Sequence, residues 1–444
     1  MPNERLCAGG SLAMVGSMPR SSVVSRIAHD SFRHSPPSIL PGGSWWENLE
    51  SNFCDRPEGF ELEPWDWARV NATAALDLVM RTWGGTLLAL TMPGAYVPSM
   101  LGGGGFVDGP DDWQIYIDLV TGGNDPSAFF REPPDGVRVT EYEPRWSIFD
   151  PDDGRCIGLK FESPYEPWNP RMAPVFAGHR NNRVARARWW RHDGGPRPVL
   201  LAIHGFMADP YWLNVRFFSL QQYYEQGYDV VLATLPHHGL RAEDSTWYSG
   251  QGFFASGMSG INESMGQAIC DLRVLMRYLR RQCGVEKIAV TGVSLGGWTS
   301  AMLASLHDDL DAVIPNVPVC SPVDLLLEWQ PAGGIVRAGL FGLRWSVRYL
   351  REIMAVTTPL TYEPKLPPER LMIIGGVGDR LAPPKHSRLL WDHWGRCRIH
   401  WFPGNHVVHL DRGEYIHHMT EFLHGLGFVH EPATVAQERL ADVG

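Results

Sequence analysis

The chain has 444 residues, of which 44% are hydrophobic and 20% charged, so it is too apolar to be disordered and long enough for a large domain with additions. Its 39 Lys and Arg against 49 Asp and Glu give a net charge of −10, which argues against a nucleic-acid binder, because such proteins present a basic face. Its 7 cysteines are odd in number and lack CxxC spacing, which argues against a disulfide framework or a zinc cluster.

The N-terminal region is predicted to be rich in loops. Residues 1–40 are rich in Ser, Pro and Arg and lack periodicity, which predicts a flexible tail. Residues 41–135 are predicted to form a helical, loop-rich extension, because apolar residues recur at helical spacing from Pro64 to Val97. No apolar run suits a secretory signal or a membrane span, so we expect a cytoplasmic protein without an integral membrane segment.

From residue 136 the sequence alternates between short apolar runs and amphipathic stretches. Strands are predicted at Val137–Tyr142, Cys156–Phe161, Arg183–Trp190, Val199–Ile203, Asp229–Leu235, Lys287–Val293, Ala312–Val317, Leu371–Gly375 and Arg398–Phe402. Helices are predicted at Tyr211–Gln226, Ile261–Gln282, Gly297–Leu306, Pro384–Trp394 and Arg412–Leu423. Because helical crossovers join the later strands, the pattern is typical of an α/β fold with a mostly parallel central sheet flanked by helices.

The domain that contains this sheet is predicted to span residues 136–430, followed by a C-terminal tail over 431–444. Between two of its strands, residues 321–369 carry apolar side chains at helical spacing. We interpret this insertion as a helical lid over the strand ends, where open α/β sheets bind ligands. A small satellite core is the simpler alternative.

A serine stands at the end of a predicted strand. Residues 292–296 have the sequence Gly-Val-Ser-Leu-Gly, which is the only G-x-S-x-G match in the chain, and a helix is predicted to begin directly after it. A sharp strand-to-helix turn would lift the hydroxyl of Ser294 clear of the sheet, and its glycine neighbours would avoid clashes. We therefore interpret Ser294 as a nucleophile. The alternative is a serine that caps a glycine-rich helix start.

A second strand ends in His204-Gly205-Phe206. The backbone amide of Phe206 could donate to a developing oxyanion, together with the amide of Leu295 after the serine, because two preorganised amides stabilise a tetrahedral intermediate. We expect His204 to shape this turn through bonds to nearby backbone and to transfer no proton.

The candidate acid and base lie in loops after the last two strands. Asp379 follows one strand and could orient an imidazole, although an aspartate there could also cap the next helix. Asp324, after the preceding strand, is the alternative acid. His406 follows the final strand and could take the serine proton, and His409 is the competing base.

Residues 198–428 resemble the α/β-hydrolase-fold serine hydrolases, a superfamily of esterases, lipases and peptidases. The resemblance lies in HGF (204–206), GVSLGG (292–297), GDRLAPP (378–384) and PGNH (403–406), which occur in the order nucleophile, acid, base. It implies the central, mostly parallel sheet, a triad of Ser294, Asp379 and His406, and catalysis without a cofactor.

Three further residues are candidates for contact with substrate. His237 and His238 end a predicted parallel strand, and Trp298 follows the serine. The paired histidines could also structure a loop. No carboxylate or cysteine cluster with metal spacing accompanies them, so we predict no metal.

These observations predict a serine esterase or lipase-like hydrolase that cleaves a small-molecule carboxylic ester through an acyl-enzyme. An acyltransferase or a peptidase of the same fold would use the same residues. A catalytically silent binding protein with this fold is the alternative from another class. Acyl length and oligomeric state do not follow from the sequence.

Overall fold

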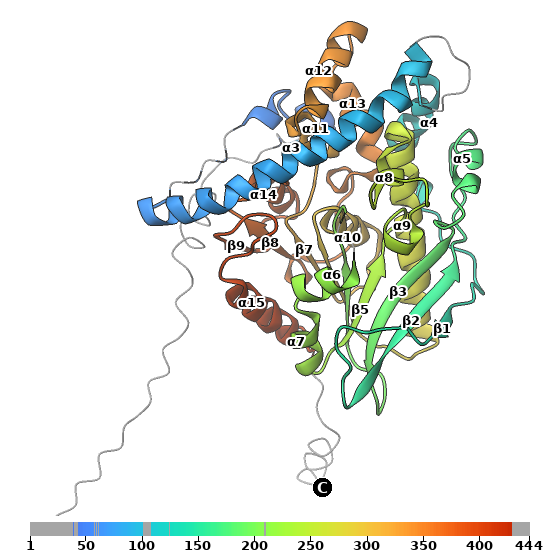
Figure 1. Ribbon diagram of the computed structural model, residues 1–444, viewed down its shortest axis with the longest axis vertical. Coiled ribbons are helices and arrows are strands. Elements are labelled where there is room, and N and C mark those ends of the chain that lie inside the picture. Colours follow the sequence, from blue (N-terminus) through green and yellow to red (C-terminus); the bar gives the residue numbers. More distant parts are fainter. Residues whose placement is uncertain are drawn as a thin grey trace, which may run out of the picture.

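The computed structural model describes residues 39, 43–56, 58, 60, 62–100, 108–123, 125–207 and 210–428, with the side chains of 92–100 left out. Within this part of the chain, a single sheet runs through the molecule and helices cover both of its faces (Figure 1). Apart from Ile39, the tail predicted over residues 1–40 lies outside the described residues. The tail predicted over 431–444 also lies outside them.

The sheet has nine strands in the order β1-β2-β3-β5-β4-β6-β7-β8-β9. Their bounds are β1 Thr140–Tyr142, β2 Gly154–Glu162, β3 Val184–His192, β4 Val199–Ile203, β5 Asp229–Thr234, β6 Ile288–Val293, β7 Ala312–Asn316, β8 Met372–Gly376 and β9 Arg398–Phe402. Strands β1 to β3 are antiparallel and β3 pairs antiparallel with β5, whereas all pairs from β5 to β9 are parallel. The predicted mostly parallel α/β sheet is confirmed.

The longer helices of the described residues are α3 Pro64–Met100, α4 Pro110–Thr121, α9 Gly257–Arg281, α10 Leu295–Leu306, α12 Ala332–Leu343, α14 Pro384–His393 and α15 Arg412–Gly425. The shorter ones are α2 Trp45–Asn48, α5 Ala173–Gly178, α6 Tyr211–Phe217, α7 Leu220–Glu225, α8 Gln251–Phe254, α11 Pro322–Glu328 and α13 Val347–Met354. Several single 3-10 turns also occur, among them η1 Phe53–Asp55. Helices α11, α12 and α13 lie in the predicted insertion, between β7 and β8.

Side-chain alternation along the parallel strands explains why both faces of the sheet are covered. All five residues of β4 are buried. Leu201 and Ile203 join a core cluster with α9 and α10, whereas Leu200 and Ala202 join another with α7 and α15. Strands buried on both faces need continuous apolar runs, which is why these strands were recognisable in the sequence.

The structure agrees with one predicted helical segment and divides another in two. The periodic stretch from Pro64 becomes one continuous helix of 37 residues, α3, which runs diagonally across the top of the sheet region (Figure 1). The single helix predicted at 211–226 is instead two, α6 and α7, because Ser219 adopts a left-handed conformation with φ 52°. A short polar side chain tolerates that conformation, and no local sequence signal marks it.

The tryptophans of the N-terminal region fall into two groups. Trp45 and Trp113 are buried against the insertion: the Trp45 indole donates to Thr361 Oγ1 at 2.9 Å, and Trp113 meets Trp345 edge to face at 5.2 Å. Others on α3 face outward, and Trp65 is 74% exposed. The N-terminal segments therefore pack on the sheet domain and its insertion, but not through all of their aromatic side chains.

Candidate active site

Ser294 occupies the turn between β6 and α10 in a strained conformation. Its φ is 57° and its ψ −111°, outside the regions that a residue with a side chain normally populates. Its amide donates to Asn316 O at 3.0 Å, and Trp298 N donates back to its carbonyl at 2.8 Å. Hydrogen bonds on both sides therefore hold the serine in this conformation at the carboxyl end of β6.

Two glycines make this turn possible. A Cβ on Gly292 would lie 2.2 Å from Gly296 O, and one on Gly296 would lie 2.0 Å from Ile203 O. Side chains at either position would therefore collide with backbone and push the turn open. The β4 strand that supplies Ile203 pairs with β6 directly below the turn, so the His204–Phe206 segment is adjacent to the serine.

Two backbone amides near Ser294 are available as donors. Neither the Phe206 N–H nor the Leu295 N–H bonds to another group among the described residues. Leu295 is the first residue of α10, where amides are unpaired and the helix dipole is positive. A Cβ on Gly205 would lie 3.4 Å from Ser294 Cβ, so the loop that carries Phe206 runs next to the serine. Both amides therefore lie next to Ser294 without a partner among the described residues, and their role as oxyanion donors stays a prediction.

His204 supports this loop, as expected, and that prediction is confirmed. Its Nδ1 donates to Gly205 O at 2.8 Å, and its Nε2 accepts from Leu235 N at 3.0 Å. Burial lowers the pKa of His204 to about 4, so the ring stays neutral. With both nitrogens used, His204 has no proton to exchange with substrate.

Asp379 and His406 are joined by a short hydrogen bond. His406 Nδ1 lies 2.6 Å from Asp379 Oδ2, and the other carboxylate oxygen accepts from the amides of Leu381 and Ala382, each at 2.8 Å. Asp379 is completely buried and His406 is 9% exposed. Burial alone would lower the pKa of His406, but the charge of Asp379 and its hydrogen bond raise it above its ordinary value.

The competing base is bonded elsewhere. His409 Nε2 lies 3.1 Å from the backbone oxygen of His406, and its Nδ1 lies 3.2 Å from the hydroxyl of Tyr415. Burial holds the pKa of His409 well below its ordinary value. His409 therefore braces the loop that carries His406 and is not placed to serve as the base.

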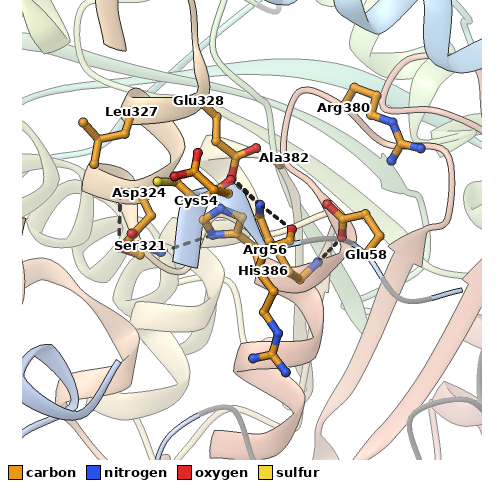
Figure 2. Close-up of polar contacts among 12 residues, drawn as sticks. Cys54, Arg56, Glu58, Ser321, Asp324, Leu327, Glu328, Arg380, Ala382 and His386 are labelled. Carbon is orange, nitrogen blue, oxygen red and sulfur yellow. Dashed lines mark hydrogen bonds and ion pairs between the residues drawn. The ribbon is translucent and has the colours of Figure 1, made fainter. Parts of the chain in front are cut away.

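The competing acid is also bonded elsewhere. Asp324 forms a bidentate ion pair with buried Arg351, at 2.6 Å and 2.9 Å, and accepts a hydrogen bond from Ser321. Figure 2 shows Asp324 beside Ser321. Of the two predicted acids, the structure brings only Asp379 to His406.

Ser294 and His406 lie at the same edge of the sheet, since β6 and β9 are parallel members that end there. No hydrogen bond joins the Ser294 hydroxyl to His406 Nε2 among the described residues, and neither atom bonds to another described group. Catalytic hydrogen bonds are often long in the absence of substrate and tighten when it binds. The structure therefore contains the hydrogen bond between Asp379 and His406 and, among the described residues, none between His406 and the Ser294 hydroxyl.

A residue that the sequence did not predict links the two catalytic loops. Asp77 of α3 accepts two backbone hydrogen bonds on the same carboxylate oxygen, from His406 N at 2.8 Å and from Arg380 N at 2.9 Å. Asp77 is completely buried. Burial, and then the charge of Asp379, raise the pKa of Asp77 to about 6. A carboxylate in the N-terminal helix thus fixes the spacing of the acid and base loops.

Other backbone and side-chain groups of α3 contact the same loops. The Asn405 amide donates to Thr73 O at 2.6 Å, and the Arg81 guanidinium donates to Arg380 O at 3.1 Å. Arg69 forms a partly exposed ion pair with Asp411 at 3.3 Å. In the sequence nothing distinguishes these residues from other polar positions of a helix, so only the three-dimensional contact could identify them.

The three residues predicted to touch substrate are all buried and bonded within the protein. His237 Nε2 accepts from the Asn182 amide at 3.2 Å, and the Trp298 indole donates to Thr357 O at 2.6 Å. His238 Nδ1 donates to Pro236 O at 2.8 Å, and its ring lies 6.1 Å from that of Phe206. These contacts structure loops around the site, and contact of the three residues with substrate stays a prediction.

A cluster of charged side chains surrounds Lys385 at the start of α14, and Figure 2 shows Glu58 and Glu328, two of its members. The Lys385 ammonium pairs with Glu328 of α11 at 2.9 Å and donates to Cys54 O at 2.7 Å, while the Lys385 amide donates to Glu58 at 3.0 Å. Burial raises the pKa of Glu58 to about 7 and that of Glu328 to about 6. The cluster joins residues 53–58, the insertion and α14.

Comparison with known proteins identifies a family model that covers the first seven strands. The family model described as "Alpha/beta hydrolase domain containing 18" matches residues 137–324, which include β1 to β7 and the serine. The chain belongs to the α/β-hydrolase superfamily. The matched segment ends before the candidate acid and base, which β8 and β9 supply.

The relatives of this chain include proteins with and without a named activity. Two uncharacterised proteins of Mycobacterium tuberculosis are each 30% identical over 296 residues, which is 64% of this chain and 66% of theirs. The chain therefore spans just under two thirds of their length. A thermostable monoacylglycerol lipase of Bacillus is 30% identical over 161 residues, which is 36% of this chain and 52% of the lipase.

Solved structures of other α/β hydrolases resemble it at low identity. An acetyl xylan esterase of Thermoanaerobacterium has a TM-score of 0.49 at 16% identity, over 72% of this chain and 96% of the esterase. An acylaminoacyl peptidase of Pyrococcus horikoshii has a TM-score of 0.39 at 15% identity, over 62% of this chain and 49% of the peptidase. Within the described residues, no helix combines the length and the apolarity needed to cross a membrane.

Proposed function

We propose that this α/β-hydrolase is a serine esterase that cleaves carboxylic esters through an acyl-enzyme intermediate. The observation that carries the proposal is the 2.6 Å bond between Asp379 and His406, at the sheet edge where strained Ser294 ends β6. A buried carboxylate that orients an imidazole, at the sheet edge where a partly exposed serine follows a strand, is the arrangement that serine hydrolases need.

In the proposed reaction, His406 Nε2 removes the proton of Ser294 as the hydroxyl oxygen attacks the ester carbonyl. The amides of Phe206 and Leu295 stabilise the oxyanion, and Asp379 stabilises the imidazolium. His406 then gives the proton to the departing alcohol. Water attacks the acyl-enzyme, with His406 again as base, and releases the acid. An alcohol or an amine in place of water would make the same site an acyltransferase.

Asp77 acts in this proposal as a positioning residue. Its carboxylate holds the backbones of Arg380 and His406, so it sets the distance between the acid and base loops without touching substrate. It also adds a second negative charge near His406, which contributes to the raised pKa of that imidazole. The insertion with α11 to α13 is proposed to be the lid of the site.

The proposed substrate is a small ester with an apolar or medium-sized acyl group. Beside the candidate oxyanion amide, the Phe206 ring meets Phe254 at 4.8 Å and Tyr248 at 6.0 Å, which supports an apolar acyl site. The name of the monoacylglycerol lipase, to which part of the chain is similar, is consistent with this class.

A fluorophosphonate probe tests the proposal, because it reacts only with an activated serine. We expect the wild-type protein to be labelled and Ser294→Ala to be unlabelled. Ser300→Ala is the matched control: this buried hydroxyl of the same helix donates to Gly297 O at 3.0 Å, and its loss should leave labelling intact. Absence of labelling in folded wild-type protein would reject the proposal that the protein is a serine esterase.

Hydrolysis of p-nitrophenyl esters of increasing acyl length then measures the substrate class. We expect a rise in kcat/KM from acetyl to medium-chain esters and activity on esters far above that on anilides. In the presence of an added alcohol, a hydrolase should release mainly free acid, whereas an acyltransferase should form mainly a new ester. Preference for the anilide would favour a peptidase.

A further inference from the structure

Away from the proposed catalytic groups, three potential metal ligands meet between β9 and α15. They are His400, the central residue of β9, and Glu414 and His418, one turn apart on α15. Their ligand atoms all lie within 4.8 Å of one another. Figure 1 shows α15 packed beside the β9 end of the sheet. Residues from two different elements therefore converge on one point.

His400 is the residue that most needs an explanation. It is 5% exposed, yet neither nitrogen of its imidazole hydrogen-bonds to another described residue. Its ring lies 4.8 Å from that of His418, at an angle of 45°. The ring therefore has little access to water, and its nitrogens remain open to a ligand on the side that faces His418.

A divalent cation would be such a ligand. Two imidazoles and one carboxylate are a ligand set that Zn²⁺ uses, with bonds of about 2.0–2.2 Å and a water in the remaining position. Tetrahedral ligands at such bond lengths lie about 3.4 Å apart. The partly exposed side chains of Glu414 and His418 can close the remaining gap by small rotations, while His400 stays fixed on the strand.

The surrounding charges are compatible with a cation. Glu421 lies 3.3 Å from His418 Nδ1 and 3.2 Å from the exposed His417, so a second carboxylate lies next to the cluster. The Arg398 guanidinium lies 3.7 Å from Glu421 and offsets part of that negative charge. Among the described residues named here, Glu421 and Arg398 therefore contribute one negative and one positive charge outside the proposed ligand set.

We propose that His400, Glu414 and His418 form a Zn²⁺ site. Its ligands come from the elements immediately before and after the loop that carries His406. Bound zinc would fasten β9 to α15 and hold both ends of that loop. The site takes no part in the proposed ester cleavage, and its existence does not depend on that proposal.

Zinc binding to untagged protein, stripped with a chelator, tests the site by equilibrium dialysis and elemental analysis. We expect one equivalent of zinc for wild type and at least about a tenfold weaker affinity for His400→Ala and for Glu414→Gln. His417→Ala is the matched control, because His417 is on the same helix but outside the cluster; it should bind like wild type. Equal binding by all four proteins would overturn the proposal.

Two further measurements distinguish loss of zinc binding from loss of folding if a variant is unstable. Glu414→Gln alters a partly exposed side chain, so circular dichroism should show it folded, and it can be compared with wild type even if His400→Ala unfolds. Co²⁺ in place of Zn²⁺ should give the visible absorption of a low-coordinate site in wild type and His417→Ala only. Zinc should raise Tm in those two proteins, and no shift in wild type would contradict the site.

Discussion

The parallel strands β4 to β9 and the N-terminal helix α3 contribute to the candidate site in different ways. Loops at the ends of the strands carry the groups proposed to take part in the reaction: Ser294, Asp379, His406 and the two amides. Helix α3 carries none of them, yet its Asp77 bonds to the backbone of both the acid and the base loops. The strand ends therefore carry the proposed reactive groups, and the helix bonds to the two loops that hold Asp379 and His406.

This difference teaches that the residues that hold the candidate site together extend beyond the sheet domain. The family match begins at residue 137, some way after α3 has ended, so the contacts of Asp77, Thr73 and Arg81 come from outside it. Their targets also lie outside it, beyond residue 324. Substitutions in the strand-end loops and in α3 can test whether the loops carry the reactive groups and the helix only positions them.

The largest expected effect is a loss of activity on substitution of a residue in the strand-end loops. His406→Ala should lower kcat for ester cleavage by about 10⁴–10⁶-fold, because it removes the proposed general base. His409→Ala removes only a brace of the same loop, so activity should stay within about a hundredfold of wild type. If the rates of p-nitrophenyl ester cleavage were equally impaired in the two variants, the assignment of His406 and not His409 as the base would be wrong.

The next effect concerns stability. Asp324→Asn leaves the buried Arg351 charge without its partner, which should cost about 3–5 kcal/mol of unfolding free energy in urea titrations. Because Asp324 does not reach His406, the variant that remains folded should keep its fluorophosphonate labelling. Labelling lost in folded Asp324→Asn, but kept in Asp379→Asn, would reverse the assignment of the acid.

Asp77 gives a pH-dependent effect whose sign follows from its pKa. The folded-state pKa is raised to about 6 from an ordinary value of about 3.9, so the folded protein binds the proton more readily. This group's contribution to stability is therefore most favourable below pH 4 and falls as pH rises to 6, by up to about 3 kcal/mol. Asp77→Asn should remove that decline, which urea unfolding between pH 4 and 7 measures.

The same variant gives a kinetic signature that a merely structural residue would not. Asp77 is one of the charges that raise the pKa of His406, so Asp77→Asn should move the acidic limb of the pH–rate profile to lower pH. Asn keeps an oxygen to accept the two amides. Asp77→Ala does not, and should lose about 1–3 kcal/mol of stability as well. An unchanged profile in Asp77→Asn would confine the residue to a structural role.

The smallest expected effect lies at the exposed end of the same helix. Arg69→Ala removes a partly exposed ion pair with Asp411, which should cost no more than about 1 kcal/mol and less at high salt. Activity should not change. A larger loss, measured by urea unfolding at low and high salt, would mean that this contact also positions the His406 loop.

Much of the sheet and of the site could be predicted because its signals are local. Buried parallel strands are short apolar runs, and the turn at Ser294 needs glycines at fixed positions two residues before and after it. Asp379 and His406 were recognisable because each follows such a strand. These patterns use only the chemistry of neighbouring residues.

The remainder depends on contacts that no local pattern encodes. Asp77 lies 303 residues from Arg380 and 329 from His406, and an aspartate in a helix is ordinarily a surface residue. The pairing of Asp324 with Arg351, which removes the alternative acid, is likewise visible only in three dimensions. The break between α6 and α7 follows from one left-handed residue, Ser219.

The double contact of Asp77 also limits how this protein can change over evolutionary time. One carboxylate oxygen serves two loops, so a substitution that shifts either loop must be matched by a change in a helix more than 300 residues earlier. Changes in these two segments, which are remote in the sequence, therefore depend on each other. We expect paired substitutions at these positions among descendants, and we expect exchange of the helix between distant relatives to fail unless the loops are exchanged with it.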